Sequence, residues 1–209
     1  METNSTLSAD VLSKLAANIK TWALELGFQQ TGITDIDLQK AETRLHHWLQ
    51  AGYHGEMHYM EKHGLKRSRA ELLIPDTQRI ISVRMNYWPD SQFNIMHLLE
   101  DKPYAYVSRY ALGRDYHKVL RKRLAKLVAQ IEAQVDHLQT RIFVDSGPVL
   151  EKALAEKAGL GWIGKHTNLI NKDAGSWFFL GEIYTNLALP IDTPASAHCG
   201  DCRLCIDIC

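Results

Sequence analysis

The stretch RIFVDSGPVLEKALAEKAGLGWIGKHTNLI, Arg141 to Ile170, organises the chain. Its first residues, 141–144, are β-branched and aromatic, which predicts a strand that ends at Asp145. Pro148 follows a turn and has the fixed φ that suits the start of a helix, which we expect to run to Gly159. Asp145 is therefore expected at the carboxyl end of a strand, where open α/β sheets usually hold ligands.

A glycine-rich segment follows this expected helix. Residues 159–164 contain three glycines in six positions and lead into Lys165 and His166. Glycine has no side chain, so it allows the backbone to approach another group closely. We interpret the segment as a place where the backbone approaches a large, flat ligand.

Composition limits the classes of protein that the chain can belong to. Hydrophobic residues make up 45% of the 209 residues and charged residues 23%, as in ordinary globular proteins. Lys+Arg and Asp+Glu both number 24, so any contact with nucleic acid must be local. The first residues lack the pattern of a signal peptide, and no run reaches the roughly 18 apolar residues of a membrane span. We expect a cytoplasmic protein without a membrane partner.

Helical and strand patterns alternate along the chain, which predicts an α+β fold with a mixed sheet flanked by helices. We expect residues 1–190 to form one catalytic domain and residues 191–209, after a linker-like run, to begin a ferredoxin-like segment. Helices are predicted within 11–26, 36–52 and 55–62 and from 113 onward, and strands within 79–87, 105–110 and 175–189.

The most specific chemical signal is the cysteine pattern at the end of the sequence. Its spacing is C-x2-C-x2-C-x3-C, as in bacterial ferredoxins, where three thiolates hold one [4Fe–4S] cluster and the fourth serves another. With three cysteines for one cluster and one for another, neither cluster has a complete set of ligands in this chain. We therefore expect a second cysteine motif of this kind further along the intact protein. A structural zinc site and a disulfide pair are the alternatives. The expected metal ligands are Cys199, Cys202, Cys205 and Cys209.

Four separated motifs carry a resemblance to a known family. They are SRYALGRDYH (108–117), FVDSGP (143–148), AEKAGLGWIGKH (155–166) and GSWFFLGE (175–182). Together with the cysteine run, in this order, they resemble epoxyqueuosine reductase. The resemblance covers nearly the whole chain.

This resemblance implies a function. Members of the family reduce epoxyqueuosine in the tRNA anticodon to queuosine, using cobalamin and two [4Fe–4S] clusters. It also implies tRNA and an electron donor, such as flavodoxin or ferredoxin, as partners, and a monomer. Removing the epoxide oxygen as water consumes two electrons and two protons, so a redox cofactor and an acid are needed. The D-x-H-x-x-G pattern that places a histidine on cobalt is incomplete, because Leu120 replaces its glycine.

The resemblance also assigns site residues. Asp145 is the expected acid; its alternative role is a turn or helix cap. Corrinoid contacts are implied for Arg67, Ser108, Asp145, Lys165, Leu169 and Ser176. A solvated charge, a surface turn or a core position explains some of these residues equally well.

Two groups of residues are candidates for contact with tRNA. The basic face of the helix after Gly113 suits a phosphate backbone, although a solvated amphipathic face explains it about as well. Tyr104, Tyr106 and Tyr110 suit base stacking or an ordinary core. The basic residues are Arg114, Lys118, Arg121, Lys122, Arg123 and Lys126.

Three other functions remain open at this point. A ferredoxin-like electron carrier would bind iron and no cobalt, and a zinc-dependent nucleic-acid-binding module would bind zinc. A related corrinoid enzyme, such as a reductive dehalogenase, would keep the cofactors and lose the preference for tRNA.

Overall fold

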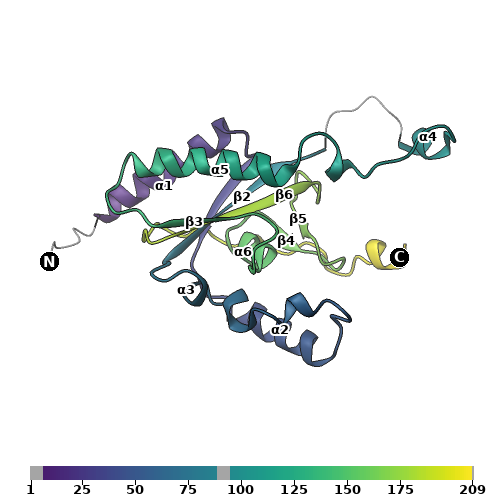
Figure 1. Ribbon diagram of the computed structural model, residues 1–209, viewed down its shortest axis with the longest axis horizontal. Helices are drawn as coiled ribbons and strands as arrows, with labels where there is room; N and C mark the ends of the chain where they lie inside the picture. Colours follow the sequence, from purple (N-terminus) through teal and green to yellow (C-terminus); the bar gives the residue numbers. More distant parts are fainter. Residues whose placement is uncertain (1–6, 89–94, 209) are drawn as a thin grey trace.

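A four-stranded sheet forms the centre of the protein (Figure 1). The structure, a computed structural model, describes residues 7–88 and 95–208. In spatial order the strands are β1 (Gln30–Thr34), β2 (Arg79–Asn86), β6 (Phe178–Thr185) and β3 (Thr140–Phe143). All three pairs of neighbouring strands are antiparallel.

The expectation of a mixed sheet was wrong. Strand β6 runs antiparallel to both β2 and β3, so the rule for open parallel sheets does not explain the position of Asp145. Alternating helices and strands indicate the element types, but the strand directions depend on pairing between distant segments. The α+β class itself is confirmed.

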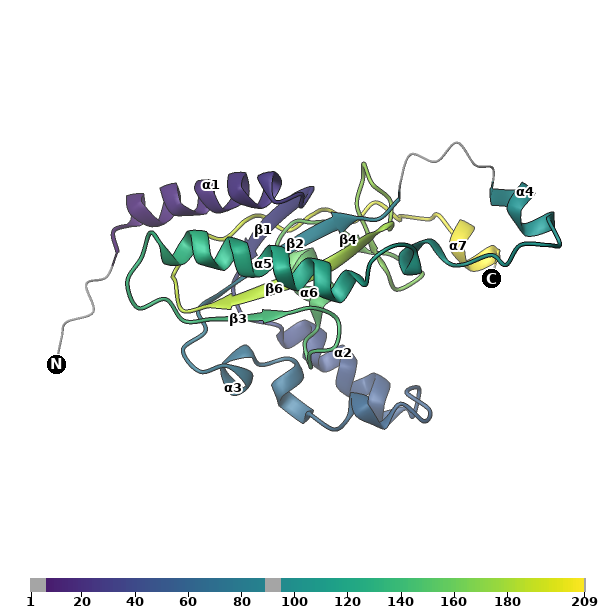
Figure 2. The same cartoon turned by 45° about the horizontal axis from the view of Figure 1, so that its top comes forward.

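One face of the sheet is covered by α1 (Ala9–Glu25) and α5 (Tyr116–Glu132), which lie over it in Figures 1 and 2. Both helices carry apolar residues at the spacing of one helix face. The buried residues of α5 are Leu120, Leu124, Leu127 and Ile131, which pack in the same core as Ile81, Val83 and Ile183 of the sheet. The side chain of Asp115 begins α5 by accepting the His117 N–H at 2.9 Å.

The opposite face of the sheet carries smaller elements. Helices α6 (Glu151–Lys157) and α3 (Ala70–Leu73) pack against Ile80 and Tyr184. The short strands β4 (Trp162–Ile163) and β5 (Leu169–Ile170) form a separate antiparallel pair. Helix α6 begins three residues after Pro148, later than the sequence pattern predicted.

Helix α2 (Gln39–Gln50) lies apart from the sheet in Figure 2 and contains no buried residue. The other short elements are α4 (Ile95–Glu100), α7 (Leu204–Asp207) and the 3-10 helices η1 (His58–Met60), η2 (Gly64–Arg67) and η3 (Arg109–Ala111). The strand expected within residues 105–110 is absent from this described part of the chain. Among the described helices, none has the length and apolar character needed to cross a membrane.

The glycine-rich segment packs closely against other parts of the protein, and its expected approach to a flat ligand stays a prediction. A Cβ on Gly161 would lie 2.2 Å from the Ile170 carbonyl oxygen, and one on Gly164 would lie 2.4 Å from the Ile170 side chain. Gly159 has φ +80°, which side chains rarely adopt. These glycines are therefore required by contacts within the protein, and they are not evidence for a flat ligand.

Gly32 provides a direct test of this packing. A Cβ there would lie 1.9 Å from the Ala158 carbonyl oxygen, a backbone atom that cannot move aside freely. We expect Gly32→Ala to lower the free energy of unfolding by about 3 kcal/mol or more, because strand β1 must shift. Urea denaturation measures the change.

Gly52→Ala is the control for this variant. Gly52 has φ +70° but no atom within 4 Å of an added Cβ, so only the backbone cost of about 1 kcal/mol applies. Equal losses of stability in the two variants would contradict the close approach of β1 to the α6 segment.

Candidate active site

A pocket of about 230 Å³ lies where the start of β6, the turn after β3 and the start of α6 meet. One wall is apolar and aromatic, and the other carries polar and charged side chains. Its lining residues are Tyr87, Tyr110, Tyr116, Asp145, Glu151, Lys152, Asn168, Leu169, Ser176, Phe178, Phe179 and Leu180.

Asp145 is fixed in this pocket by contacts from α5. The Tyr116 hydroxyl donates to Asp145 Oδ2 at 2.5 Å, and His117 Nε2 lies 3.0 Å from the same oxygen. Neither contact uses Oδ1. The Asp145 side chain is 54% exposed, and its backbone has φ +55°, which is uncommon for a residue with a side chain. The structure thus presents a carboxyl group at the pocket from a strained turn.

The two residues from α5 form a supported pair. The other ring nitrogen of His117, Nδ1, lies 3.1 Å from Asp115 Oδ1, so the imidazole lies between two carboxyl groups. Burial, and then the hydrogen bond to Asp145, raise the pKa of Tyr116 above its ordinary value. Tyr116 therefore remains a hydrogen-bond donor through the neutral range.

Two further carboxyl groups lie behind Asp145. Burial, and then the charge of Asp145, raise the pKa of Glu151 to about 7. Glu182 is fully buried on β6, and burial raises its pKa well above the ordinary value. The sequence analysis did not identify either residue. Only the GSWFFLGE motif, which ends in Glu182, offered a signal.

The expected corrinoid contacts divide into two groups. Asp145, Leu169 and Ser176 line the pocket, and the Ser176 hydroxyl donates to the Leu169 carbonyl at 2.8 Å. The other three do not line it. Arg67 is buried and donates to the Tyr59 carbonyl at 2.8 Å, and Ser108 is exposed before η3. These contacts remain predictions.

Lys165 supports the cysteine segment. Its Nζ donates to the carbonyl oxygens of Gly200 and Cys202 at 2.8 and 2.9 Å. Trp162 Nε1 donates to Cys199 Sγ at 3.3 Å, and this hydrogen bond is the main cause that lowers the pKa of the Cys199 thiol. The described thiols, Cys199, Cys202 and Cys205, are not in disulfides, and Cys209 lies outside the described residues.

The basic face of α5 has mixed roles. Arg123 donates to the Gly27 carbonyl at 3.0 Å, and Arg121 donates to the Ser146 hydroxyl at 3.0 Å, so these two residues hold the fold together. The remaining cations on this face, Arg114, Lys118, Lys122 and Lys126, are exposed.

Several aromatic residues are exposed, and one of them, Tyr110, lines the pocket. The expected tyrosines, 104, 106 and 110, are exposed rather than part of the core. Trp88 and Trp177 are also exposed, and their ring centroids lie 4.4 Å apart. The Arg109 guanidinium lies 3.9 Å from the Trp88 ring centroid. Exposed aromatic rings thus include one in the pocket lining and a tilted pair, Trp88 and Trp177.

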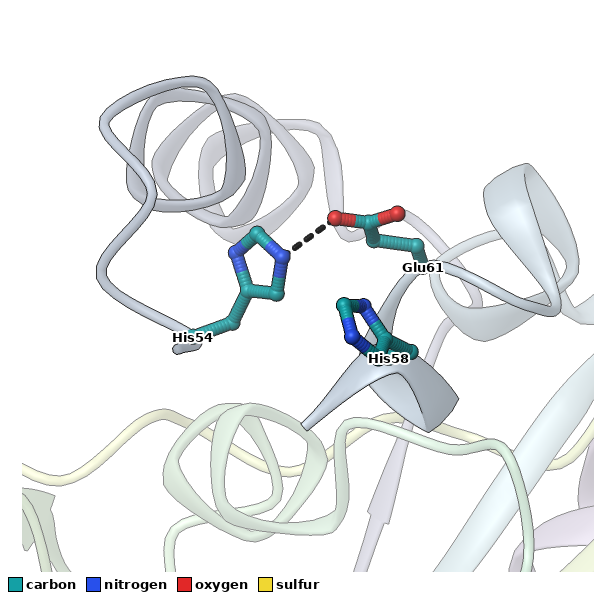
Figure 3. A group of neighbouring side chains, drawn as sticks. All are labelled: His54, His58 and Glu61. Carbon is teal, nitrogen blue, oxygen red and sulfur yellow. Dashed lines mark ion pairs between the residues drawn. The ribbon is translucent and has the colours of Figure 1, made fainter. Parts of the chain in front are cut away.

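A separate group of possible metal ligands lies in the segment after α2 and in and just after η1 (Figure 3). Each of His54, His58 and Glu61 offers a ligand atom within 4.8 Å of the others. His54 is buried and its Nε2 forms an ion pair with Glu61, which accounts for the closeness of these two. None of the three residues lines the pocket that contains Asp145.

The raised pKa of Glu151 predicts how stability depends on pH. Because the folded state holds this proton more tightly than the unfolded state, its contribution is complete below the ordinary pKa of 4.5. It is lost as the pH rises through about 7. We therefore expect Glu151→Gln to gain stability relative to wild type between about pH 4 and pH 8, by at most about 3 kcal/mol. Urea denaturation at both pH values measures it.

Glu156→Gln is the matched control, because Glu156 lies on the same helix and accepts the Ile163 N–H at 2.7 Å outside the pocket. The same pH-dependent gain in both variants would show that the effect does not come from burial beside Asp145.

The chain is similar to known proteins. Residues 67–146 match the family model described as epoxyqueuosine reductase QueG, DUF1730. Epoxyqueuosine reductase of Xanthomonas campestris is 58% identical over 93% of this chain and 55% of its own length. The chain thus spans about half the length of the curated relatives that it matches.

Solved structures give the same assignment. Epoxyqueuosine reductase with a tRNA-Tyr epoxyqueuosine-modified stem loop has a TM-score of 0.79 and 25% identity, over 93% of this chain and 51% of that chain. A reductive dehalogenase, whose structure suggests a B12-dependent mechanism, has a TM-score of 0.56 and 16% identity, over 93% of this chain and 22% of that chain. The dehalogenase shares the fold. Over nearly its whole length, the chain is therefore similar to one part of the epoxyqueuosine reductases, a family of oxidoreductases.

Proposed function

We propose that this chain forms the catalytic pocket of an enzyme that reduces epoxyqueuosine in tRNA to queuosine. The observation that carries the proposal is Asp145, a half-exposed carboxyl held toward a pocket by Tyr116 and His117. The similarity to an epoxyqueuosine reductase with a modified tRNA stem loop supports the same substrate.

The reaction requires an acid at the epoxide oxygen. Asp145 donates a proton to this oxygen as a carbon–oxygen bond breaks. Tyr116 and His117 contact only Oδ2, so Oδ1 can face the substrate while the carboxyl is held in one orientation. A fixed acid within hydrogen-bonding reach typically contributes about 10²–10⁴-fold to the rate.

The pocket lining fits part of a cobalamin. Its volume is below the roughly 300–1,000 Å³ of pockets that enclose a small molecule, so this pocket could hold only part of a cobalamin. Phe178, Phe179 and Leu180 provide an apolar wall for the ring, and Lys152, Asn168 and Ser176 provide polar groups for its amides. When bound, cobalamin would supply a strongly reducing cobalt centre for the strained carbon.

The cysteine segment fits an iron–sulfur centre. Cys199, Cys202 and Cys205 lie on one turn and the short helix α7. The lowered pKa of Cys199 favours the thiolate, which is the form that binds metal. Lys165 holds two backbone carbonyls of this turn, which joins the segment to the region beside the pocket.

The surface beside the pocket fits single-stranded RNA. Exposed aromatic rings stack bases, and exposed cations contact phosphates. Tyr110 lines the pocket, Trp177 lies in sequence between two lining residues, Ser176 and Phe178, and α5, which begins with the lining residue Tyr116, carries exposed cations. An anticodon loop in this position would present its modified base to Asp145.

Asp145→Asn tests the acid. The amide keeps the size of the side chain but has no acidic proton, so we expect kcat on epoxyqueuosine-containing tRNA to fall about 10²-fold or more. Anaerobic reconstitution with iron, sulfide and cobalamin, followed by metal analysis, should show that the variant retains cobalt as the wild type does.

Asp136→Asn, on the exposed loop after α5, is the control and should keep full activity. Undiminished activity of Asp145→Asn would exclude the acid role. If the reconstituted wild type contains iron but no cobalt, a ferredoxin-like electron carrier would be favoured. If it contains only zinc, both the cobalamin-dependent reductase and the electron carrier would be excluded.

The salt dependence of tRNA binding tests the basic face of α5. Lys118→Gln with Lys122→Gln removes two exposed cations. If both contact phosphates, the slope of log K against log salt should decrease by about 1.4–1.8 in magnitude. Filter binding over a range of salt concentrations measures the slope.

Lys40→Gln is the matched control, because Lys40 is exposed on α2, away from α5. An unchanged slope in the double variant would show that tRNA does not follow this face.

A further inference from the structure

Three carboxyl groups lead from the centre of the sheet to the pocket. Glu182 lies on β6 with no exposed surface, and neither of its carboxyl oxygens has a hydrogen-bond partner. Its neighbour on β2, Ser82, also has a hydroxyl without a partner. Glu151, at the start of α6, lines the same pocket as Asp145. Asp145 itself is accessible to solvent.

Burying carboxyl groups in this way is costly, because a buried carboxylate needs hydrogen bonds or a cation to replace water. A buried carboxyl avoids part of this cost by remaining protonated. Strongly perturbed carboxyls beside a pocket are frequently functional. The pocket thus has a neutral carboxyl group behind its exposed one.

The charges around Glu151 come from every element packed against it. The charge of Asp145, in the turn after β3, raises its pKa in addition to burial, while Lys152 and the Asp145 N–H lower it. From α5, His117 lowers the pKa of Glu151, and the Tyr116 hydroxyl also interacts with it. From β6, Glu182 interacts with it as a like charge. The sum places the pKa at about 7, so roughly half of the Glu151 side chains carry a proton at neutral pH, where an ordinary glutamate is almost fully ionised.

The proposed reaction consumes two protons, and an acid that has donated once must be reprotonated before it can donate again, so a second acid in the pocket can supply the second proton directly. We propose that Glu151 is the second acid of the pocket and donates the proton with which the epoxide oxygen leaves as water. This inference rests on the proposed function. It assigns to Glu151 a role that the placement of Asp145 leaves open.

The step balances as follows. The epoxide, two electrons and two protons give an alkene and one water. Asp145 first takes a proton from solvent and then donates it to the oxygen as the first carbon–oxygen bond breaks, which leaves a hydroxyl group. Glu151 protonates that hydroxyl as the second bond breaks. The two electrons come from the low-potential reductant of the proposed function, and solvent then returns a proton to Glu151.

The pH profile of kcat tests this role. Because Glu151 must be protonated, wild-type kcat should decrease as the pH rises through about 7. Glu151→Gln should lower kcat about 10²-fold or more and lose this pH limb, and Glu151→Asp should recover part of both. The matched control, Glu156→Gln, should keep the wild-type rate and profile. A purely structural role for Glu151 would change stability and leave the pH limb in place.

Infrared difference spectra provide a readout that does not depend on turnover. Raising the pH of the reconstituted wild-type protein through neutrality should remove a carbonyl band of a protonated carboxyl, and this change should be missing in Glu151→Gln and present in Glu156→Gln. A wild type that shows the band change but has no reductase activity would contradict the proposed function alone. Absence of the band change, or an unaltered pH limb in Glu151→Gln, would overturn the role of Glu151.

Discussion

The antiparallel pairing of β6 with both β2 and β3 is the constraint on which the rest of the structure depends. Strand β6 comes late in the sequence, yet it lies between two earlier strands. One face carries Ile183 into the core under α1 and α5, and the other carries Glu182 and Tyr184 toward α6. Successive side chains of a strand point to opposite faces of the sheet. Strand β6 therefore contributes to the apolar core with one face and to the site with the other.

The site contains features that lower the stability of the fold and that lie where the proposed chemistry takes place. The core under α1 and α5 is apolar and closely packed, as expected for a stable domain. The opposite face keeps two carboxyls with strongly raised pKa values and a backbone turn at Asp145 with positive φ. Both features are costly, and both lie beside the pocket. Such costs at one location are typical of active sites, where geometry is held against local preference.

The cysteine segment is tied to the rest of the protein at several points. Asp192 accepts the Ile33 N–H at 2.8 Å and pairs with Lys20 at 2.5 Å, which fixes the chain before the cysteines. Trp162 and Lys165 then contact the cysteine turn itself. Since these two residues follow α6, the element that carries Glu151, a redox centre held by the cysteines would be connected to the pocket through a short stretch of chain.

The sequence alone determined the locally encoded features. The periodic helices α1 and α5 and strand β2 follow from patterns within short segments, and the structure contains these three elements where they were expected. The cysteine spacing is likewise local, and the roles of the cysteines and of Asp145 stay predictions. The resemblance to the family was also recognisable from the sequence, because each of the four separated motifs is an uninterrupted run of residues.

Tertiary structure alone decided what depends on distant segments. The strand directions, the packing role of Gly161, the contact between Tyr116 and Asp145, and the position of Glu151 beside Asp145 require the sheet to be assembled first. A pKa is likewise a property of burial and neighbouring charges, so no residue pattern could show that Glu151 retains its proton near pH 7. The conformational preferences of short segments determine which residues form helices and strands. The free energies of closing long loops and of burying charged groups determine which of these elements pack together.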